Sequence, residues 1–226
     1  MKKFFVCGKN PERLKEIEKK FESQGFELSN SPEIIIVSGG DGSLLISERK
    51  FPGIPKLLIR DSLTCKRCYD LDTEGIIEVI KDNNYKIKKI KKIKAKINDK
   101  EIIGLNDIII KNKNPNTALR FEVFINDEIV NEFIGDGVVI ATHYGSTGYF
   151  SSITGKDFKK GIGIAFNNVT DRFRHINLEN NDKIKIKIKR GPGILSFDNS
   201  CNFIELKEDD EIEVNESDKK ARIIML

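Results

Sequence analysis

Apolar and polar residues follow one another in the first part of the chain in a way that predicts strands and helices in turn. Phe4 to Cys7 form a short apolar run that predicts a first strand. Ile34 to Val37 are four aliphatic residues in succession, which is typical of a strand buried on both faces. Ile54 to Ile59 predict a further strand. Strands separated by a helix favour a parallel sheet, so we expect a small α/β unit at the N-terminus.

The helix between the first two strands is predicted over residues 11–24. Its apolar residues recur on one face: Leu14, Ile17 and Phe21. Asn10 suits the N-cap, Pro11 suits the first helical position, and Gly25 suits the residue that ends the helix.

Beyond residue 82 the pattern changes to short strands joined by polar turns. The segments that show it are Lys91 to Ile97, the turn Asn98-Asp99-Lys100, Arg120 to Ile125, the turn Asn126-Asp127, and Ile184 to Lys189. The last of these alternates strictly, with one apolar and one polar face. We therefore expect an α/β domain over residues 1–82 and a β-rich domain over residues 83–226. In this arrangement the extreme C-terminus can pack back on the first domain.

A glycine-rich turn follows the buried strand directly. Gly39, Gly40 and Gly42 surround Asp41 with bare backbone, whose N–H groups can approach a phosphate or a ribose closely. Open α/β sheets bind ligands at the carboxyl ends of their strands. We expect a phosphate-binding loop made of Gly39, Gly40, Gly42 and Ser43, with Asp41 as the catalytic residue. An ordinary strand-to-helix turn uses the same residue types.

Two later segments carry related chemistry. Asn106 and Asp107 place an amide and an acid side by side at the start of an apolar strand. The segment from Gly135 to Ser152 holds an acid-bearing glycine turn, an apolar strand, and then hydroxyl residues, glycines and a tyrosine. Hydroxyl groups and backbone amides can bind a nucleoside, and a tyrosine can stack on its base.

Taken together, these three segments resemble the NAD kinase family. The resemblance is strongest from Ile34 to about Ser152 and continues more faintly through Ser196-Phe197-Asp198. It implies an α/β N-terminal domain with a small parallel sheet, a C-terminal all-β, sandwich-like domain, and a nucleotide site in the crevice between them. It also implies an ATP-dependent NAD kinase that transfers the γ-phosphate of ATP to the 2′-hydroxyl of the adenosine ribose of NAD. The implied cofactor is Mg²⁺ or another divalent cation, with no protein residue assigned as its ligand.

The resemblance implies a role for each matching residue. Asp41 corresponds to the general base and contacts NAD, and Gly42 lies against the same nucleotide. Asn106 and Asp107 correspond to the pair that holds the dinucleotide, and Asp136 to an acid near the nicotinamide end. The adenine-side contacts correspond to Thr147, Gly148, Tyr149 and Ser152.

The chain departs from the family pattern at several places. His143 and Tyr144 replace the usual Pro-Thr, Thr154 replaces a glycine, and Asp107 stands where glutamate is also found. Residues 165–170 lack the proline and histidine of a segment that completes the site across a subunit interface in the family. We expect a homodimer or homotetramer and leave open what the divergent segment at 165–175 contributes to a neighbouring site. The preference for NAD or NADH, and for ATP or polyphosphate, also stays open.

Two other functions compete with this interpretation. A lipid or sugar kinase can share the Gly-Gly-Asp-Gly turn, although Asn106-Asp107 and Gly145 to Tyr149 argue against it. A non-catalytic NAD-binding or nucleotide-binding homologue would keep the fold and lose turnover.

Composition and charge limit the kinds of binding partner that we expect for this protein. The chain has 226 residues, a formal net charge of +4 and 38% hydrophobic residues. The basic run from Lys86 to Lys96 is interleaved with isoleucines instead of base-stacking aromatics, so we expect a solvated strand face and no nucleic-acid partner. No apolar run approaches the roughly 20 residues of a membrane span, and Lys9 to Glu12 interrupt the N-terminus before a secretory segment could form. We expect a cytoplasmic enzyme.

The cysteines give one suggestive spacing, Cys65-Lys66-Arg67-Cys68. A structural zinc site needs four ligands, so Cys7, Cys201 or a histidine would have to converge on this pair. We expect reduced thiols and leave metal binding by Cys65 and Cys68 open.

Overall fold

The computed structural model describes residues 2–60, 72–171 and 173–226. The Cys65/Cys68 pair lies outside the described residues. The chain divides into two compact units, one of residues 1–90 with 220–226 and one of residues 91–219. The sequence placed the boundary at residue 82, whereas the observed division falls inside a strand that runs on from one unit to the other, Lys86–Ile97.

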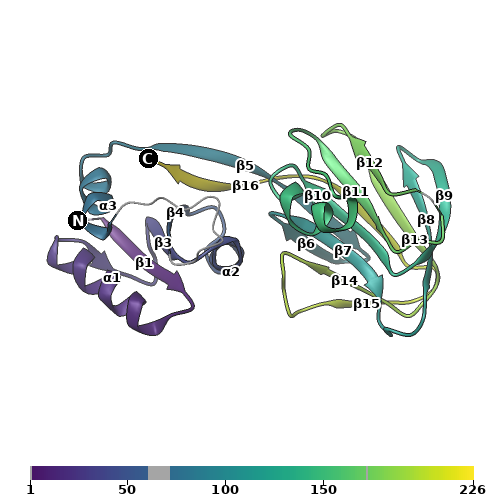
Figure 1. Cartoon of the computed structure of the whole chain (residues 1–226), viewed down its shortest axis with the longest axis horizontal. Coiled ribbons are helices and arrows are strands. Elements are labelled where there is room, and N and C mark those ends of the chain that lie inside the picture. Colours follow the sequence, from purple (N-terminus) through teal and green to yellow (C-terminus); the bar gives the residue numbers. More distant parts are fainter. Residues whose placement is uncertain (1, 61–71, 172) are drawn as a thin grey trace. The chain divides into compact units, whose positions relative to one another are not determined.

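The first unit alternates strands with helices (Figure 1). Its elements are β1 (Lys3–Gly8), α1 (Pro11–Ser23), β2 (Glu27–Leu28), β3 (Ile34–Ser38), α2 (Asp41–Lys50), β4 (Pro55–Ile59) and α3 (Thr73–Lys81). The strands form a parallel sheet in the order β2-β1-β3-β4, and the end of β16 (Glu211–Met225) pairs with β4 through Arg222 and Ile223. The predicted parallel sheet with helices is confirmed.

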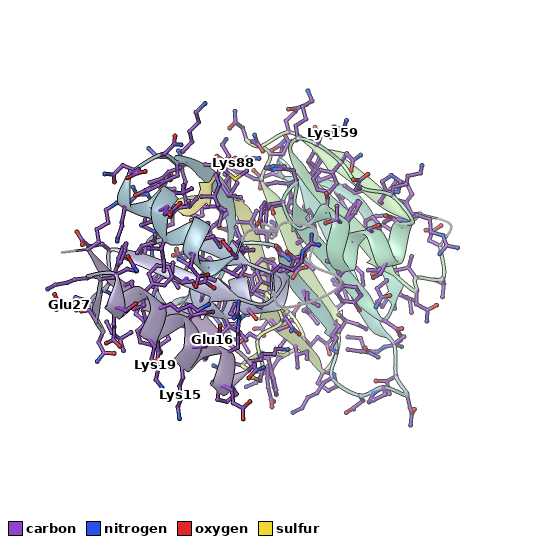
Figure 2. All side chains as sticks on the ribbon, turned by 60° about the vertical axis from the view of Figure 1, so that its left-hand side comes forward. Lys15, Glu16, Lys19, Glu27, Lys88 and Lys159 are labelled. Atoms are coloured by element: carbon purple, nitrogen blue, oxygen red, sulfur yellow. The ribbon has the colours of Figure 1, made fainter. Side chains whose placement is uncertain are left out.

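The helix α1 shows how the sequence pattern produces the packing of this unit. Ile17 and Phe21 are fully buried, and Phe21 stacks on Phe4 of β1 with ring centroids 5.0 Å apart. Asn10 caps the helix because its side-chain oxygen accepts the N–H groups of the first turn, as predicted. The charged side chains of the opposite face, among them Lys15 and Lys19, point away from the ribbon (Figure 2).

The second unit consists of strands and one short helical segment. Its elements are β5 (Lys86–Ile97), β6 (Lys100–Gly104), β7 (Asp107–Asn112), β8 (Leu119–Ile125), β9 (Glu128–Gly135), β10 (Gly137–Thr142), η1 (Ser146–Phe150), α4 (Ser151–Thr154), β11 (Ile162–Asn167), β12 (His175–Leu178), β13 (Ile184–Arg190), β14 (Gly193–Phe197), β15 (Ile204–Leu206) and the first part of β16. One antiparallel sheet has the order β12-β11-β10-β7-β14-β15. The other runs β16-β13-β8-β9, and β5 pairs with both β16 and β6.

These two sheets enclose a single core. It takes side chains from both, including Phe121 and Phe133 of one sheet and Phe166 of the other, and the rings of Phe133 and Phe166 stack at 4.2 Å. This arrangement confirms the predicted β-sandwich-like domain. The hairpin turns at Asn98 and at Asn126-Asp127 adopt positive φ, the conformation that asparagine and aspartate tolerate best.

The basic run lies on β5. Ile90, Ile93 and Ala95 are buried and most lysines of the run are exposed, but Lys92 is itself buried and Lys94 is half-buried. Buried residues alternate strictly with more exposed ones only from Ile93 to Ile97, so a solvated lysine face covers only part of the strand. Among the described residues, no helix is long and apolar enough to span a bilayer.

A buried ion pair supports the helix that follows the glycine turn. Lys56 of β4 is fully buried and pairs with Glu48 of α2, which is 3% exposed. The Lys56 Nζ group also donates to the carbonyl oxygens of Phe51 at 2.6 Å and Ile54 at 2.8 Å. The Glu48 carboxylate accepts the N–H of Gly53 at 3.0 Å. The pair thus joins α2, the following turn and β4.

We predict that Lys56→Met strongly destabilises the protein. Methionine fills a similar volume but leaves the Glu48 charge buried without its cation, which costs about 3–5 kcal/mol in comparable cases. Urea denaturation measures the free energy of unfolding. Lys160→Met is the control, because Lys160 pairs with Glu179 on the surface, where both side chains are more than three-quarters exposed. Equal effects of the two substitutions would contradict a stabilising role for the buried pair.

Candidate functional site

The residues predicted for the site fall on both units. Gly39 to Ser43 belong to the first unit. The second unit holds the remaining candidates: Asn106, Asp107, Asp136, Thr147, Gly148, Tyr149 and Ser152.

The glycine turn joins β3 to α2. Every residue of β3 is buried, and the chain leaves the strand through Gly39, whose N–H donates to the Ile59 carbonyl of β4 at 3.2 Å. Gly40 is the N-cap of α2 and has no side chain to cap it. Asp41 is the first residue of the helix and is half-buried. The residues expected as a loop are therefore a sharp turn and the first helical turn.

This geometry suits the binding of an anion. The N-terminus of a helix carries a partial positive charge and directs N–H groups outward, and a glycine N-cap leaves space for a ligand oxygen in place of a capping side chain. The Asp41 carboxylate stands at the same end of α2.

The glycines of the turn have different structural roles. Gly39 has a φ of +134°, and a Cβ built there would lie 2.4 Å from the Ser43 hydroxyl oxygen. Ser43 is only 5% exposed, so its side chain packs inside the turn. A Cβ on Gly42 would meet nothing within 4 Å. Gly39 is therefore required by the fold, whereas the fold leaves the space beside Gly42 open.

In the second unit, the Asn106-Asp107 turn lies between β6 and β7. The carboxylate of Asp198, which follows β14, accepts the main-chain N–H groups of Leu105 at 2.6 Å, Asn106 at 2.7 Å and Asp107 at 3.3 Å. Asp198 is 2% exposed. The sequence indicated Asp198 only as part of a faint resemblance.

The carbonyl groups of the same turn are held from β10. The Thr142 hydroxyl donates to the Leu105 carbonyl at 2.7 Å, and the Thr142 N–H donates to the Asn106 carbonyl at 2.9 Å. The same hydroxyl oxygen accepts the Gly145 N–H at 3.1 Å. A Cβ on Gly145 would lie 2.2 Å from the Asn106 carbonyl oxygen, so glycine is needed for this close approach. The two loops predicted for the site are thus in contact.

The side chains of Asn106 and Asp107 have unusual surroundings. The Asn106 Oδ1 atom is buried and has no hydrogen-bond partner within the described part of the chain. Asp107 is 5% exposed, and burial, followed by the nearby charge of Asp198, raises the pKa of its carboxyl to about 7. The turn therefore offers an unpaired acceptor next to a carboxyl group that changes protonation near neutral pH.

The segment η1-α4 is fixed to the outer face of the β12-to-β15 sheet. Phe150 is 1% exposed and packs there with Val139 of β10 and Ala165 of β11. The candidate residues of this segment remain exposed: Thr147, Gly148, Tyr149 and Ser152. The Ser152 hydroxyl donates to the Tyr149 carbonyl at 2.8 Å, so it stabilises the turn. Phe150 thus anchors the segment that presents Tyr149.

Two asparagines at the end of β11 contact the candidate residues directly. The Asn167 amide donates to the Tyr149 hydroxyl and the Asn168 amide donates to the Asp136 carboxylate, each at 3.2 Å. Burial, followed by the charges of Asp136 and Asp107, raises the pKa of Tyr149. The sequence singled out this segment only for the proline and histidine it lacks, because only pairing of β11 with β10 brings it beside Asp136.

No group of three or more histidine, cysteine, aspartate or glutamate side chains in the described ranges could hold a metal ion. Cys7 is buried and Cys201 is exposed, and both are free thiols. Mg²⁺ often binds through substrate phosphates with one or two carboxylates instead of an all-protein cage.

We predict that the two glycines of the turn respond differently to alanine. Gly39→Ala should lower the free energy of unfolding by about 1–3 kcal/mol, because the new Cβ meets Ser43 in a strained conformation. Gly42→Ala should keep or raise the stability by up to about 1 kcal/mol, because it places alanine in open space on a helix. Urea titration of both variants checks this. A loss of stability in Gly42→Ala as large as that in Gly39→Ala would show that the space is not open.

Comparisons of this chain with known protein families and proteins all find NAD kinases. The family profile described as ATP-NAD kinase C-terminal domain matches residues 105–226. The bifunctional NADP phosphatase/NAD kinase of Methanocaldococcus jannaschii is 30% identical over 215 residues, which cover 88% of this chain and 37% of that protein. The NAD kinase of Clostridium perfringens is 29% identical over 231 residues, covering 95% of this chain and 82% of the relative.

The fold has a counterpart among solved structures. An NAD kinase from Archaeoglobus fulgidus, solved in complex with ATP, superimposes with a TM-score of 0.82 at 17% identity, covering 99% of this chain and 93% of that one. The family profile spans more than half of the 226 residues. The chain belongs to the NAD kinase family.

Proposed function

We propose that this protein is an ATP-dependent NAD kinase that transfers the γ-phosphate of ATP to the 2′-hydroxyl of the adenosine ribose of NAD, giving NADP. The observation that carries the proposal is the position of Asp41, which is the first residue of α2 at the carboxyl end of the buried strand β3. The family membership supplies the substrate class.

In this proposal Asp41 is the general base. Its carboxylate accepts the proton of the 2′-hydroxyl as the oxygen attacks the γ-phosphorus, and the bond from phosphorus to the bridging oxygen of ADP breaks. The N-terminus of α2, with Gly39, Gly40 and Gly42 before and inside it, stabilises negative charge on the phosphates. Positioning and charge stabilisation supply most of the acceleration in phosphoryl transfer.

Mg²⁺, or another divalent cation, enters this proposal bound to the ATP phosphates, and it supplies neutralisation of their charge. Polyphosphate presents the same phosphate chemistry, so it is the alternative donor to test beside ATP.

The second unit is proposed to hold NAD. Asn106 and Asp107 bind the dinucleotide, and Asp136 lies near its nicotinamide end. The exposed ring of Tyr149 and its neighbours Thr147, Gly148 and Ser152 make the adenine-side contacts. The hydrogen bonds from Asn167 to Tyr149 and from Asn168 to Asp136 support this assignment, because they orient two of the proposed ligands.

We further propose that the protein is cytoplasmic and works as a homodimer or homotetramer. The family completes its site across a subunit interface with the segment that corresponds to residues 165–175. In this chain that segment contacts proposed ligand residues of its own subunit through Asn167 and Asn168.

We predict that Asp41→Asn reduces NADP formation about 10²- to 10⁴-fold while NAD still binds, because a general base contributes that much and the amide keeps its shape. An NADP-specific dehydrogenase detects the product, and calorimetry measures NAD binding. Asp72→Asn is the matched control, because Asp72 also stands at a helix start in the first unit, and asparagine can replace it as the N-cap of α3.

The outcomes separate the competing functions. Equal NADP formation by wild type and Asp41→Asn would remove Asp41 from its role. NAD binding without turnover in the wild type would indicate the non-catalytic nucleotide-binding homologue. Turnover of ATP only with a lipid or sugar acceptor would indicate a different kinase with the same glycine turn.

We predict that Asp136 favours NAD over NADH. The oxidised nicotinamide ring carries a positive charge and the reduced ring does not, so a nearby carboxylate attracts only the oxidised form, by about 1 kcal/mol in a solvated site. Asp136→Asn should therefore lower kcat/KM for NAD several-fold more than for NADH. Parallel assays with both dinucleotides check this. An equal loss with both would place Asp136 away from the nicotinamide.

A further inference from the structure

A buried carboxylate outside the set of predicted ligands controls the Asn106-Asp107 turn. Asp198 accepts three consecutive main-chain N–H groups, those of residues 105, 106 and 107. Hydrogen bonds to an ionised acceptor are shorter and stronger than those between neutral groups, and two of these measure 2.6 and 2.7 Å. One side chain therefore determines where the main chain of the whole turn lies.

We propose that Asp198 is a positioning residue of the nucleotide site, whose carboxylate fixes the Asn106-Asp107 turn and whose charge acts on the neighbouring Asp107 carboxyl. The kinetic part of this inference rests on the proposed function. The structural part, which concerns the turn and its titration, does not depend on turnover.

The backbone explains why an aspartate can occupy this position. β14 pairs with β7, and the paired residues Phe197 and Ile108 bring the residue after the strand beside Asp107. The Asp198 N–H donates to the Asp107 carbonyl at 3.3 Å. Asp198 and Asn199 both have positive φ, 47° and 54°. Aspartate and asparagine are the side-chain-bearing residues that adopt this conformation most readily, so an aspartate reaches the turn at little conformational cost.

The turn is also held from its other side, so its geometry is over-determined. Thr142 binds the carbonyls of Leu105 and Asn106, and Gly145 packs against the Asn106 main chain. With its main chain fixed on both sides, the turn directs the unpaired Oδ1 atom of Asn106 and the carboxyl of Asp107 in one arrangement. Preorganised groups of this kind bind a ligand without an ordering cost.

The charge of Asp198 also acts on Asp107. Burial is the larger cause of the raised pKa of Asp107 and the Asp198 charge is the next, while a hydrogen bond from the Asp198 main chain lowers it. The other ionisable groups on β7 and the elements around it include Lys111 of β7, Asp136 before β10, His143 after β10, Tyr149 of η1, and Lys100 and Glu101 of β6. Tyr149 is itself affected by the Asp107 charge.

The direction in which pH changes the stability follows from the raised pKa of Asp107. The pKa of Asp107 rises from 3.8 to about 7, so the folded protein favours the protonated carboxyl. Its contribution to stability is fully present below pH 3.8 and is lost as the pH rises towards 7. A variant without the Asp198 charge should lose part of this dependence, because the folded pKa of Asp107 moves back towards its ordinary value.

The test compares Asp198→Asn with Asp210→Asn. Asparagine tolerates the positive φ and keeps one acceptor oxygen, so the variant removes the charge and at least one of the three hydrogen bonds. Asp210 is the matched control, because its carboxylate accepts a main-chain N–H in a turn of the same unit, that of Lys207 at 2.8 Å. Circular dichroism verifies that both variants fold.

Three measurements follow. Hydrogen exchange of the peptide that contains residues 105–107 should be faster in Asp198→Asn. The KM for NAD should rise at least about tenfold, with a smaller change in kcat. The pH midpoint near 7 in kcat/KM for NAD should fall towards lower pH, and Asp107→Asn, which lacks the titrating group, should abolish that midpoint.

The outcomes are distinct. Unchanged exchange and an unchanged midpoint in a folded Asp198→Asn variant would overturn the proposal, as would equal effects of Asp210→Asn. A raised KM with an unmoved midpoint would overturn the part that concerns charge. A wild type that makes no NADP would instead refute the proposed function, and the exchange measurement, with the pH dependence of unfolding, would still test the role of Asp198.

Discussion

Burial of a strand on both faces is the constraint on which the candidate residues of each unit depend. In the first unit β3 is buried throughout, and the chain must leave it through Gly39 to begin α2 at Asp41. In the second unit β10 is buried throughout as well. Its Val138 and Ile140 face the sandwich core, while Val139 and Ala141 pack under Phe150. Strands covered on both faces cannot shift their register without exposing apolar side chains, so the turns at their ends are held in place.

Those turns carry polar groups that cannot remain unpaired in a buried setting. At the start of β7 the main-chain donors go to Asp198 and the main-chain acceptors to Thr142. The turn therefore satisfies its backbone largely through the side chains of Asp198 and Thr142, and it leaves the buried Asn106 Oδ1 atom for another partner. An acid buried beside a second acid is costly to ionise, and this cost is what brings the pKa of Asp107 close to neutral. The Asn106-Asp107 turn therefore affects both the stability of the fold and the protonation of a proposed ligand residue.

Buried neighbours and hydrogen bonds also hold the exposed candidate residues in place. Tyr149 is accessible because Phe150, its neighbour, is buried, and because Asn167 binds its hydroxyl group. Asn168 similarly binds the Asp136 carboxylate. A segment that departs from the family pattern thus contributes contacts of its own, through amide side chains instead of a proline and a histidine.

The sequence by itself determined several of the elements and their order along the chain. Apolar spacing predicted α1 with its Asn10 cap, the buried strand β3 and the strict alternation of β13, because these features depend on local periodicity and local hydrogen bonding. It also identified Asp41, Asn106, Asp107 and Tyr149 as candidates from short motifs. It could not show that Asp41 begins a helix, that Lys56 is buried against Glu48, or that Asp198, Thr142, Asn167 and Asn168 contact the candidates. Most of these contacts depend on the pairing of strands that are far apart in the chain, such as β7 and β14. Local sequence patterns do not show which strands become neighbours.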